Sequence, residues 1–400
     1  MNTKKPTIIN LIGQMFGTSG YASHYRKLAN ELNKLTDCKI ITNLQPGFER
    51  QVNDQELEMI KREQDYDINI VVTHPLHWRA NLSAKRNFVY LIWEGDKVPK
   101  WILEECRNEK IEKIICPSEH TKQALLNTLK ELMTPKFTPV LKAIIVTEDY
   151  MNREKIEKYI NDKLVVIPHG YNKEDFYSQQ AAKGLGVKSP VVKKATPADT
   201  FKFLANKGLR NLEDRGGLQY LINAYLSEFT ESNNVELILK INPAYGVPNL
   251  LKMFPNIKKN GVPKITFIPQ EYTIKQLNDL YNSCDVFVSP TRAEAFNIPC
   301  LESLACGKPV ISTTFGGQTD FIKENHNGWL IDGKLTQVTH ETEYEETSWL
   351  TPNMEDLKKM LRMCYTNQDI VEEVSKNCIK SIEHLTWKNC AKLILDLVKG

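Results

Sequence analysis

The stretch FVSPTRAEAFNIPCLESLACGKPV, residues 287–310, carries the local signals of a strand, a loop, a helix and a second strand. Pro299 suits the first turn of a helix, where its missing N–H costs nothing, and Gly307 followed by Pro309 is typical of a helix end. The pattern predicts a strand over 285–290, a helix over 299–306 and a strand over 309–312. Strands joined by a helical crossover run parallel, so this stretch indicates a doubly wound α/β sheet.

Two carboxylates stand in this otherwise apolar stretch, and a proline separates them. Glu294 falls in the loop before the expected helix, whereas Glu302 falls inside the helix. A helix N-terminus carries partial positive charge and free N–H groups, so it attracts a phosphate. The two acids could then accept hydrogen bonds from hydroxyls beside that phosphate, which fits a diphosphate flanked by two polyols, as in a nucleotide sugar. Two exposed acids, one of them well placed against the helix dipole, are the simpler alternative.

The rest of the chain alternates short apolar runs with helical patterns, in two series. The expected strands are 7–12, 38–43, 68–73, 88–92, 113–116 and 164–167, then 201–205, 235–241, 264–268, 285–289 and 309–312. Helical patterns cover 21–35, 119–132, 215–229, 274–282 and 355–366. Most of the strands are continuous apolar runs, which is typical of strands buried on both faces of a parallel sheet. The two series therefore predict two Rossmann-like, doubly wound domains.

The boundary between the two series falls within 168–200. Residues 179–200, QQAAKGLGVKSPVVKKATPADT, have no clear period and are rich in turn-forming residues, which predicts a surface loop. We therefore divide the chain into an N-terminal domain, 1–168, and a C-terminal domain, 169–383. Residues 133–162 are interpreted as an insertion with a strand and a helix of its own, and the sequence leaves its role open.

Composition excludes several function classes. The net charge of +3 among 400 residues is too small to indicate a polyanionic partner. The nine cysteines are scattered without a Cys-x-x-Cys pair, so we expect no metal site, no disulfide framework and a cytoplasmic setting. No apolar run approaches the roughly 20 residues that span a bilayer. The start of the chain, MNTKKPTIINLIG, is interpreted as the first strand, with a signal peptide as the alternative.

A glycine-rich loop follows this first strand. In LIGQMFGTSGYASHYRKLANEL, residues 11–32, three glycines precede a helical pattern, and such a loop lets the backbone approach an anionic ligand. A dinucleotide site of the Rossmann type would need an acid at the end of the second strand, where this chain has Asn43. A nicotinamide enzyme and a purely structural tight turn remain the alternatives.

A basic loop follows the first strand of the second series. Within FKFLANKGLRNLEDRGGLQYLINAY, residues 201–225, the loop contains Lys207, Arg210 and Arg215. Arginine forks suit phosphate oxygens, so the loop is a candidate for binding a diphosphate. A solvated basic loop is the alternative.

Five segments in order along the chain resemble family 4 retaining glycosyltransferases, whose fold is GT-B. PTRAEAFNIPCLESLACGKPVISTTFGGQTDFI, residues 290–322, is similar to the Glu-x7-Glu signature of that family. The other four segments are YLIWEGDKVPKWIL (90–103), IICPSEHTKQAL (114–125), VIPHGYNKEDF (166–176) and LTWKNCAKLIL (385–395). The resemblance implies two Rossmann-like domains with a cleft between them, and a final helix, about 384–400, that crosses back to the first domain.

The same resemblance implies roles in binding a donor. Glu302 would bind the ribose hydroxyls, and Glu294 would contact the sugar that is transferred. Arg210 and Arg215 match the basic pair that neutralises the diphosphate, although the spacing leaves open whether Lys207 or Arg210 takes the first role. The backbone of the second-domain loop would touch sugar and diphosphate at Phe296, Asn297 and Ile298. The first-domain loop that faces the phosphates is matched by Gly17, Thr18, Ser19 and Gly20.

His74 and Glu94 are the best matches to the acceptor-side groups of that family. A buried structural histidine is the alternative for His74. The activity that the resemblance implies is metal-independent transfer of a sugar, with retention, from a UDP- or GDP-sugar to an acceptor hydroxyl. No cofactor beyond this donor is expected. A GT-B epimerase and a catalytically silent nucleotide-sugar-binding subunit are the alternatives.

The acceptor and the oligomeric state are left open by the sequence. A glycan, a lipid, a protein, a small molecule or a modified nucleic-acid base all fit the implied chemistry. A lipid acceptor would add peripheral membrane contact to the cytoplasmic setting, because relatives of that kind use basic amphipathic helices. The corresponding helix, 119–132, is only weakly basic.

Overall fold

The computed structural model describes residues 8–17, 20–44, 46–63, 67–133, 146–179, 200–243, 246–344 and 346–400. Its contacts divide the chain into two compact units. The first unit comprises Met1–His169, Gln337–Ser348 and Trp387–Gly400, and the second comprises Gly170–Thr336 and Trp349–Thr386. The division based on sequence had 337–348 in the second domain. In the structure, the contacts of this segment assign it to the first unit.

The first unit is built on a six-stranded parallel sheet. In spatial order its strands are β2 (Asp37–Ile41), β1 (Ile8–Gly13), β3 (Ile68–Val72), β4 (Arg86–Tyr90), β5 (Ile111–Cys116) and β6 (Leu164–Val166). Every residue of β3 is buried, as expected for a strand covered by helices on both faces. The strand order reverses between β1 and β3, and ligands of open α/β sheets bind at such switch points.

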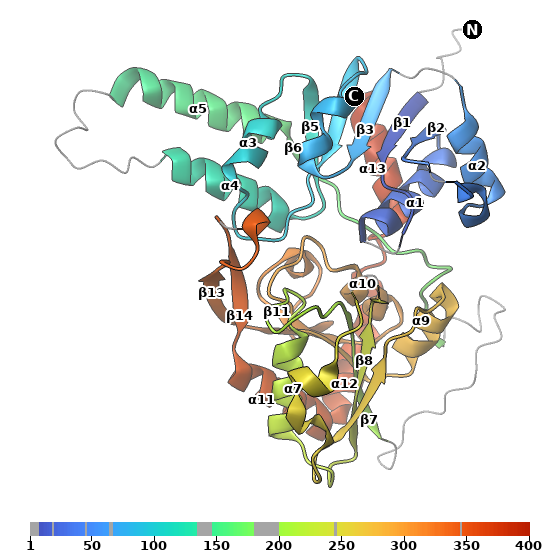
Figure 1. Ribbon diagram of the computed structural model, residues 1–400, viewed down its shortest axis with the longest axis vertical. Helices are drawn as coiled ribbons and strands as arrows, with labels where there is room; N and C mark the ends of the chain where they lie inside the picture. Colours follow the sequence, from blue (N-terminus) through green and yellow to red (C-terminus); the bar gives the residue numbers. More distant parts are fainter. Residues whose placement is uncertain are drawn as a thin grey trace. The chain divides into compact units, whose positions relative to one another are not determined.

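Helices cover this first sheet. They are α1 (Gly20–Asn33), α2 (Asp54–Lys61), α3 (Lys100–Cys106), α4 (Glu119–Met133), α5 (Val146–Lys163) and α13 (Trp387–Lys399). Although α13 closes the chain, it lies against α1 in the first unit (Figure 1). Its buried residues recur every three or four positions, so one apolar face of the helix packs on that unit. Among the described residues, no helix is long and apolar enough to cross a membrane.

The second unit contains another six-stranded parallel sheet. Its order is β12 (Gly328–Ile331), β11 (Val310–Thr313), β10 (Val286–Ser289), β7 (Phe201–Lys207), β8 (Val235–Ile241) and β9 (Lys264–Ile268). The helices are α7 (Leu218–Glu228), α8 (Leu250–Met253), α9 (Ile274–Asn282), α10 (Ile298–Ala305), α11 (Met354–Thr366) and α12 (Gln368–Ser381). Here the strand order reverses between β7 and β10, which makes their carboxyl ends the expected ligand edge.

Smaller elements complete the structure. Strands β13 (Gly333–Gln337) and β14 (Ser348–Pro352) form a two-stranded sheet. Single turns of 3-10 helix are Phe48–Gln51, Pro75–His77, Arg79–Asn81, Pro255–Lys258, Gly317–Asp320 and Thr342–Tyr344.

All of the strands predicted from the two series are present, with ends shifted by at most two residues. The expected α/β, doubly wound fold class is therefore confirmed. Helix α10 begins at Ile298, so Pro299 is its second residue rather than its first. The helix of the 133–162 insertion is α5, while residues 134–145 lie outside the described residues. The surface loop predicted for 179–200 also lies outside them, apart from its two end residues.

Two histidines are buried side by side in the first unit. The rings of His24, on α1, and His169 lie 4.2 Å apart between centroids, and both lie within 5.4 Å of the Trp387 ring. Burial lowers the pKa of His169 to about 3. Burial, followed by the charge of His169, lowers the pKa of His24 well below its usual value. The folded chain therefore keeps both imidazoles neutral at acidities where an unfolded chain would protonate them.

This pair is expected to make the fold sensitive to acid. An unfolded histidine has a pKa of about 6.5, so the stability is complete above that pH and falls as the pH drops toward 3. Each histidine contributes a loss of up to about 1.4 kcal/mol per pH unit in that range. We expect His169→Phe to lower the pH at which half of the protein is unfolded. Tryptophan fluorescence during an acid titration measures that pH. His77→Gln, at an exposed position of the same unit, should not change it. An unchanged acid midpoint in His169→Phe would contradict this account.

Candidate functional site

A cluster of charged side chains, Lys207, Arg215 and Glu294, lies where the strand order of the second sheet reverses. Strand β7 ends at Lys207, and the loop after β10 carries Glu294 before helix α10 begins. Because neighbouring parallel strands end at the same edge of a sheet, these two loops meet. The second unit thus places Lys207 and Glu294 at the edge where open α/β sheets bind ligands.

Glu294 is surrounded by basic and amide groups. The Lys207 ammonium donates to Glu294 Oε1 at 2.6 Å and to Asn297 Oδ1 at 2.9 Å. Arg215 lies 3.7 Å from Glu294 Oε2 and donates to the Ala293 carbonyl at 3.2 Å. The side chain of Lys207 is only 5% exposed and that of Glu294 is 20% exposed, so little water screens the pair.

The charges around Glu294 keep it ionised. Burial by itself would raise the pKa of Glu294, because a carboxylate loses its hydration. The charges of Lys207 and Arg215 and the hydrogen bond from Lys207 together outweigh burial and hold that pKa below its usual value. The acid is therefore an anion between two cations, and the site has cationic charge that a bound anion could share.

Asn297 shapes the turn into helix α10. It precedes the helix in the left-handed region, with φ 74° and ψ 62°, a conformation that asparagine tolerates better than most residues. Its side chain accepts from Lys207 and donates to Ser289 Oγ at 3.1 Å. The turn fixes the chain just before Ile298, the first residue of α10, where helix N–H groups lack partners within the helix. Phe296 packs its ring against Phe321 in the core.

Glycines let the surrounding loops touch. A Cβ on Gly317 would collide with the Ala295 carbonyl, and the Gly317 N–H donates to the Glu294 carbonyl at 2.8 Å. Gly217 has φ 77°, and a Cβ there would collide with the Pro290 carbonyl. Neither position has room for a side chain, so the loop that carries Glu294 is held by close backbone contact from two directions.

The basic loop is fastened to the acidic one. Arg292 N–H donates to the Arg215 carbonyl at 2.7 Å, and its guanidinium donates to the Glu213 carbonyl at 3.0 Å. This fixes Arg215 beside Glu294. By contrast, Arg210 has an exposed side chain, and its N–H is bound by Asp214 at 2.9 Å. Of the two candidates for the first basic role, the structure brings Lys207, and not Arg210, to Glu294.

Glu302 belongs to a second buried network at the same edge. It lies in α10 with 8% of its surface exposed. The phenol of Tyr281, on α9, donates to Glu302 Oε2 at 3.0 Å, and the amide of Asn206, on β7, donates to that phenol at 3.1 Å. Asn206 directly precedes Lys207, so the end of one strand serves both acids.

The residues predicted for the first-domain loop lie after β1. Gly17 has φ 99°, and its carbonyl accepts from Arg26 at 3.2 Å. Gly20 is the first residue of α1. Thr18 and Ser19 lie outside the described residues. The loop therefore starts from the switch point of the first sheet, as a loop that faces an anion would.

His74 and Glu94 both contact the segment 337–348. His74 Nε2 lies 2.8 Å from Glu343 Oε1, and Leu76 N–H donates to His74 Nδ1 at 3.4 Å. The Glu94 carboxylate accepts from the phenol of Tyr344 at 3.0 Å. His74 is partly exposed, so it is not the buried structural histidine that was the alternative reading.

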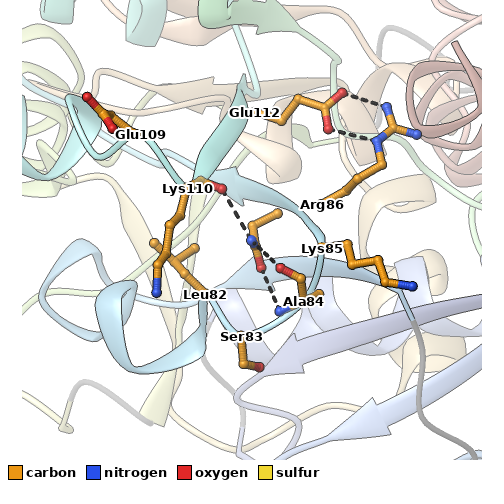
Figure 2. Close-up of a pocket in the computed structure, with 9 residues that line it drawn as sticks. Leu82, Ser83, Ala84, Lys85, Arg86, Glu109, Lys110 and Glu112 are labelled. Carbon is orange, nitrogen blue, oxygen red and sulfur yellow. Dashed lines mark hydrogen bonds and ion pairs between the residues drawn. The ribbon is translucent and has the colours of Figure 1, made fainter.

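No described residues suggest a metal centre, because they contain no group of three His, Cys, Asp or Glu side chains arranged to hold an ion. In the first unit, a hollow of about 410 Å³ opens at the amino ends of β4 and β5, the edge of that sheet opposite the loop that contains Gly17 (Figure 2). Beside it Arg86 donates to Glu112 through two nitrogens, at 2.7 and 2.5 Å. This bidentate pair ties the two strands together, and we assign the hollow no function.

Sequence reasoning did not single out Asn206, Tyr281 or Arg292. Tyr281 reads as one more apolar position of a helix, and Asn206 as the first polar residue after an apolar strand. Their roles depend on contacts between residues that are 21 to 77 positions apart in the sequence. Only Arg292 could have been noticed from the sequence, because it is a charged residue that stands between an apolar strand and the two acids.

Comparison with known proteins gives partial matches in sequence. Residues 256–342, which include Glu294 and Glu302, match the family described as glycosyl transferases group 1. The chain is 27% identical over 259 residues to a probable sucrose-phosphate synthase from Thermosipho melanesiensis, a match that covers 63% of this chain and 51% of that relative. It is 32% identical over 74 residues to a D-inositol 3-phosphate glycosyltransferase from Rhodococcus opacus, covering 18% of this chain and 16% of that relative. The first of these matches thus spans about half the length of the relative.

Solved structures share the fold over nearly the whole chain. Anabaena HepE, solved in complex with UDP-glucose, has a TM-score of 0.64 at 13% identity and covers 98% of this chain and 99% of its own. Sucrose-phosphate synthase from Thermosynechococcus elongatus has a TM-score of 0.60 at 14% identity and covers 98% of both chains. The two parallel sheets therefore form a GT-B fold with two Rossmann-like domains.

Proposed function

We propose that this chain is a glycosyltransferase that moves a sugar from a nucleotide diphosphate sugar to an acceptor hydroxyl, with retention of anomeric configuration. The observation that carries the proposal is the cluster at the switch point of the second sheet. There Lys207 and Arg215 flank Glu294 directly before the N-terminus of α10, and Glu302 stands inside that helix. A diphosphate needs cations and free N–H groups, and a sugar and a ribose need acceptors for their hydroxyls.

In the proposed reaction the bond between C1 of the sugar and the diphosphate oxygen breaks, and a bond from C1 to the acceptor oxygen forms. The acceptor proton passes to the departing diphosphate, so no protein nucleophile is required. Negative charge grows on the diphosphate as it leaves. Lys207, Arg215 and the N–H groups at the start of α10 would stabilise that charge, and preorganised charges of this kind supply a large part of catalysis.

Each acid has its own duty in the proposal. Glu294, ionised between Lys207 and Arg215, would accept hydrogen bonds from the transferred sugar. Glu302 would accept hydrogen bonds from the ribose. In the first unit, Gly17 to Gly20 are assigned to the phosphates, and His74 and Glu94 to the acceptor. We favour a UDP- or GDP-sugar as donor. The structural relative HepE was solved with UDP-glucose, which supports the first of these.

A panel of nucleotide sugars is expected to identify the donor by thermal shift. Ligand that binds only the folded state at about 100 times its Kd stabilises it by about 2.7 kcal/mol, which raises the unfolding midpoint by about 5–10 °C for a domain of this size. We expect one UDP- or GDP-sugar to give such a shift, and the matching free sugar and nucleoside to give none. A panel without any shift would contradict the proposal.

The same panel separates the proposed activity from its rivals. The donor that binds is incubated with the chain alone and with acceptor glycans, lipids and peptides. Nucleoside diphosphate released only with an acceptor supports transfer. Conversion of the donor sugar to its epimer without an acceptor would identify an epimerase, and binding without any turnover would identify a silent binding subunit.

A further inference from the structure

Glu302 is held by a chain of two hydrogen bonds that connects three elements. The phenol of Tyr281, from α9, donates to Glu302 Oε2 at 3.0 Å, and the amide of Asn206, from β7, donates to the phenol oxygen at 3.1 Å. Tyr281 is 1% exposed and Glu302 is 8% exposed. The carboxylate is thus oriented by a buried phenol, which is itself held by the partly buried amide of Asn206.

The direction of these hydrogen bonds is determined by the groups that make them. An amide N–H can only donate, so Asn206 occupies the acceptor side of the phenol oxygen. The phenol hydrogen is then left to point at the carboxylate of Glu302. The Tyr281 ring cannot turn away, since it lies 5.9 Å from the Phe176 ring and 5.5 Å from the Phe287 ring, between centroids.

Packing alone does not account for a tyrosine at this position. A phenylalanine would fill the same apolar space, and a buried hydroxyl costs free energy unless it is hydrogen-bonded. Burial first, and then the negative charge of Glu302, raise the pKa of Tyr281 well above its usual value, so the phenol stays a neutral donor. A neutral donor fixes the orientation of the carboxylate without adding a positive charge, unlike the ammonium that faces Glu294.

We propose that Tyr281 and Asn206 are positioning residues that hold the Glu302 carboxylate in the orientation that accepts hydrogen bonds from the ribose of the donor. The inference rests on the proposed function and deepens it. In this proposal both residues act through Glu302, so replacing either one should weaken recognition of the ribose hydroxyls. Asn206 and Lys207 are consecutive, so a shift at the end of β7 would disturb the supports of both acids together.

The test measures recognition of the ribose hydroxyls directly. Calorimetric titration of the full chain uses UDP, or GDP where UDP does not bind, and the matching 2′,3′-dideoxy nucleoside diphosphate. The parent should prefer the ribose nucleotide by about tenfold or more, the range for hydrogen bonds to a charged group. Tyr281→Phe should lower this preference at least about fivefold and leave the affinity for the dideoxy nucleotide within about twofold. Asn206→Asp replaces the amide donor by a carboxylate, which would compete with Glu302 for the phenol hydrogen of Tyr281. This variant should also lower the preference for the ribose nucleotide.

Two controls separate positioning from general damage. Tyr225→Phe removes another buried tyrosine hydroxyl of the same unit, bonded to the Lys264 carbonyl at 2.9 Å, and should leave the preference unchanged. In a Glu302→Gln background, adding Tyr281→Phe should cause no further loss, because the residue acts through Glu302.

The outcomes distinguish this inference from the function on which it rests. Retention of the full preference in Tyr281→Phe overturns the inference. A parent that binds UDP or GDP but does not prefer it over the dideoxy analogue also overturns the inference, while nucleotide binding and transfer stand. A parent that binds neither nucleotide overturns the proposed function and this inference with it.

Discussion

Replacing Arg215 by alanine is expected to lower the rate of sugar transfer by about 100- to 1,000-fold, the usual cost of removing one preorganised group that stabilises growing negative charge. Arg215 is placed for this by its own bond to the Ala293 carbonyl and by Arg292, whose N–H donates to the Arg215 carbonyl at 2.7 Å. The rate is measured as release of nucleoside diphosphate in the presence of acceptor, at saturating donor. Because the charge is greatest when the diphosphate leaves, kcat should fall more than the affinity for the donor.

Matched variants test whether the loss belongs to the site. Arg215→Lys keeps the charge and should retain activity within about tenfold of the parent, since a lysine can neutralise phosphate as a point charge. Arg362→Ala removes an arginine of the same unit that donates to Glu228 at 2.7 Å, and should leave the rate unchanged. Parental turnover in Arg215→Ala would remove this residue from the proposed mechanism.

The main strands could be predicted because each is an apolar run between turn-forming residues. Strands β13 and β14 were not predicted, since β13 is mostly exposed and its sequence, GKLTQ, has no apolar run. The short strand β12 was also missed. Its four residues, GWLI, become a strand by pairing with β11, a contact between elements that local sequence does not encode.

The length of β7 explains why the sequence could not decide whether Lys207 or Arg210 is the first member of the basic pair expected at the diphosphate. The apolar run suggested a strand that ends at residue 205, whereas β7 continues to Lys207. Its last two residues are polar and are strand only because they pair with Lys240 and Ile241 of β8. This extension carries the Lys207 side chain to the sheet edge beside Glu294. The acids themselves could be predicted, because the helix signals at Pro299 and Gly307 depend on local sequence alone.

Replacing Lys207 by methionine is expected to destabilise the second unit by about 2–3 kcal/mol. Breaking a buried ion pair leaves its partner charge uncompensated, which costs about 3–5 kcal/mol when no other partner remains. Glu294 keeps Arg215 at 3.7 Å and is 20% exposed, so the expected cost lies below that range. Thermal unfolding at pH 7.5 should show a midpoint lowered by about 5–10 °C. Lys275→Met breaks an exposed ion pair with Asp279 in the same unit and should leave the midpoint nearly unchanged.

The pH dependence identifies the uncompensated charge as the cause. In the parent the lowered pKa of Glu294 contributes stability that is present above its unfolded pKa and is lost as the pH falls through its folded pKa. Lys207→Met removes the charge and the hydrogen bond that lower that pKa, so the pKa of Glu294 rises relative to the parent and the variant becomes relatively more stable as Glu294 takes up a proton. The gap between the two midpoints should therefore narrow from pH 7.5 to pH 5. Adding Glu294→Gln to Lys207→Met removes the buried charge and should recover most of the stability at pH 7.5. A gap that does not change with pH, or a double variant as unstable as the single one, would mean that lost packing, and not the charge of Glu294, destabilises the variant.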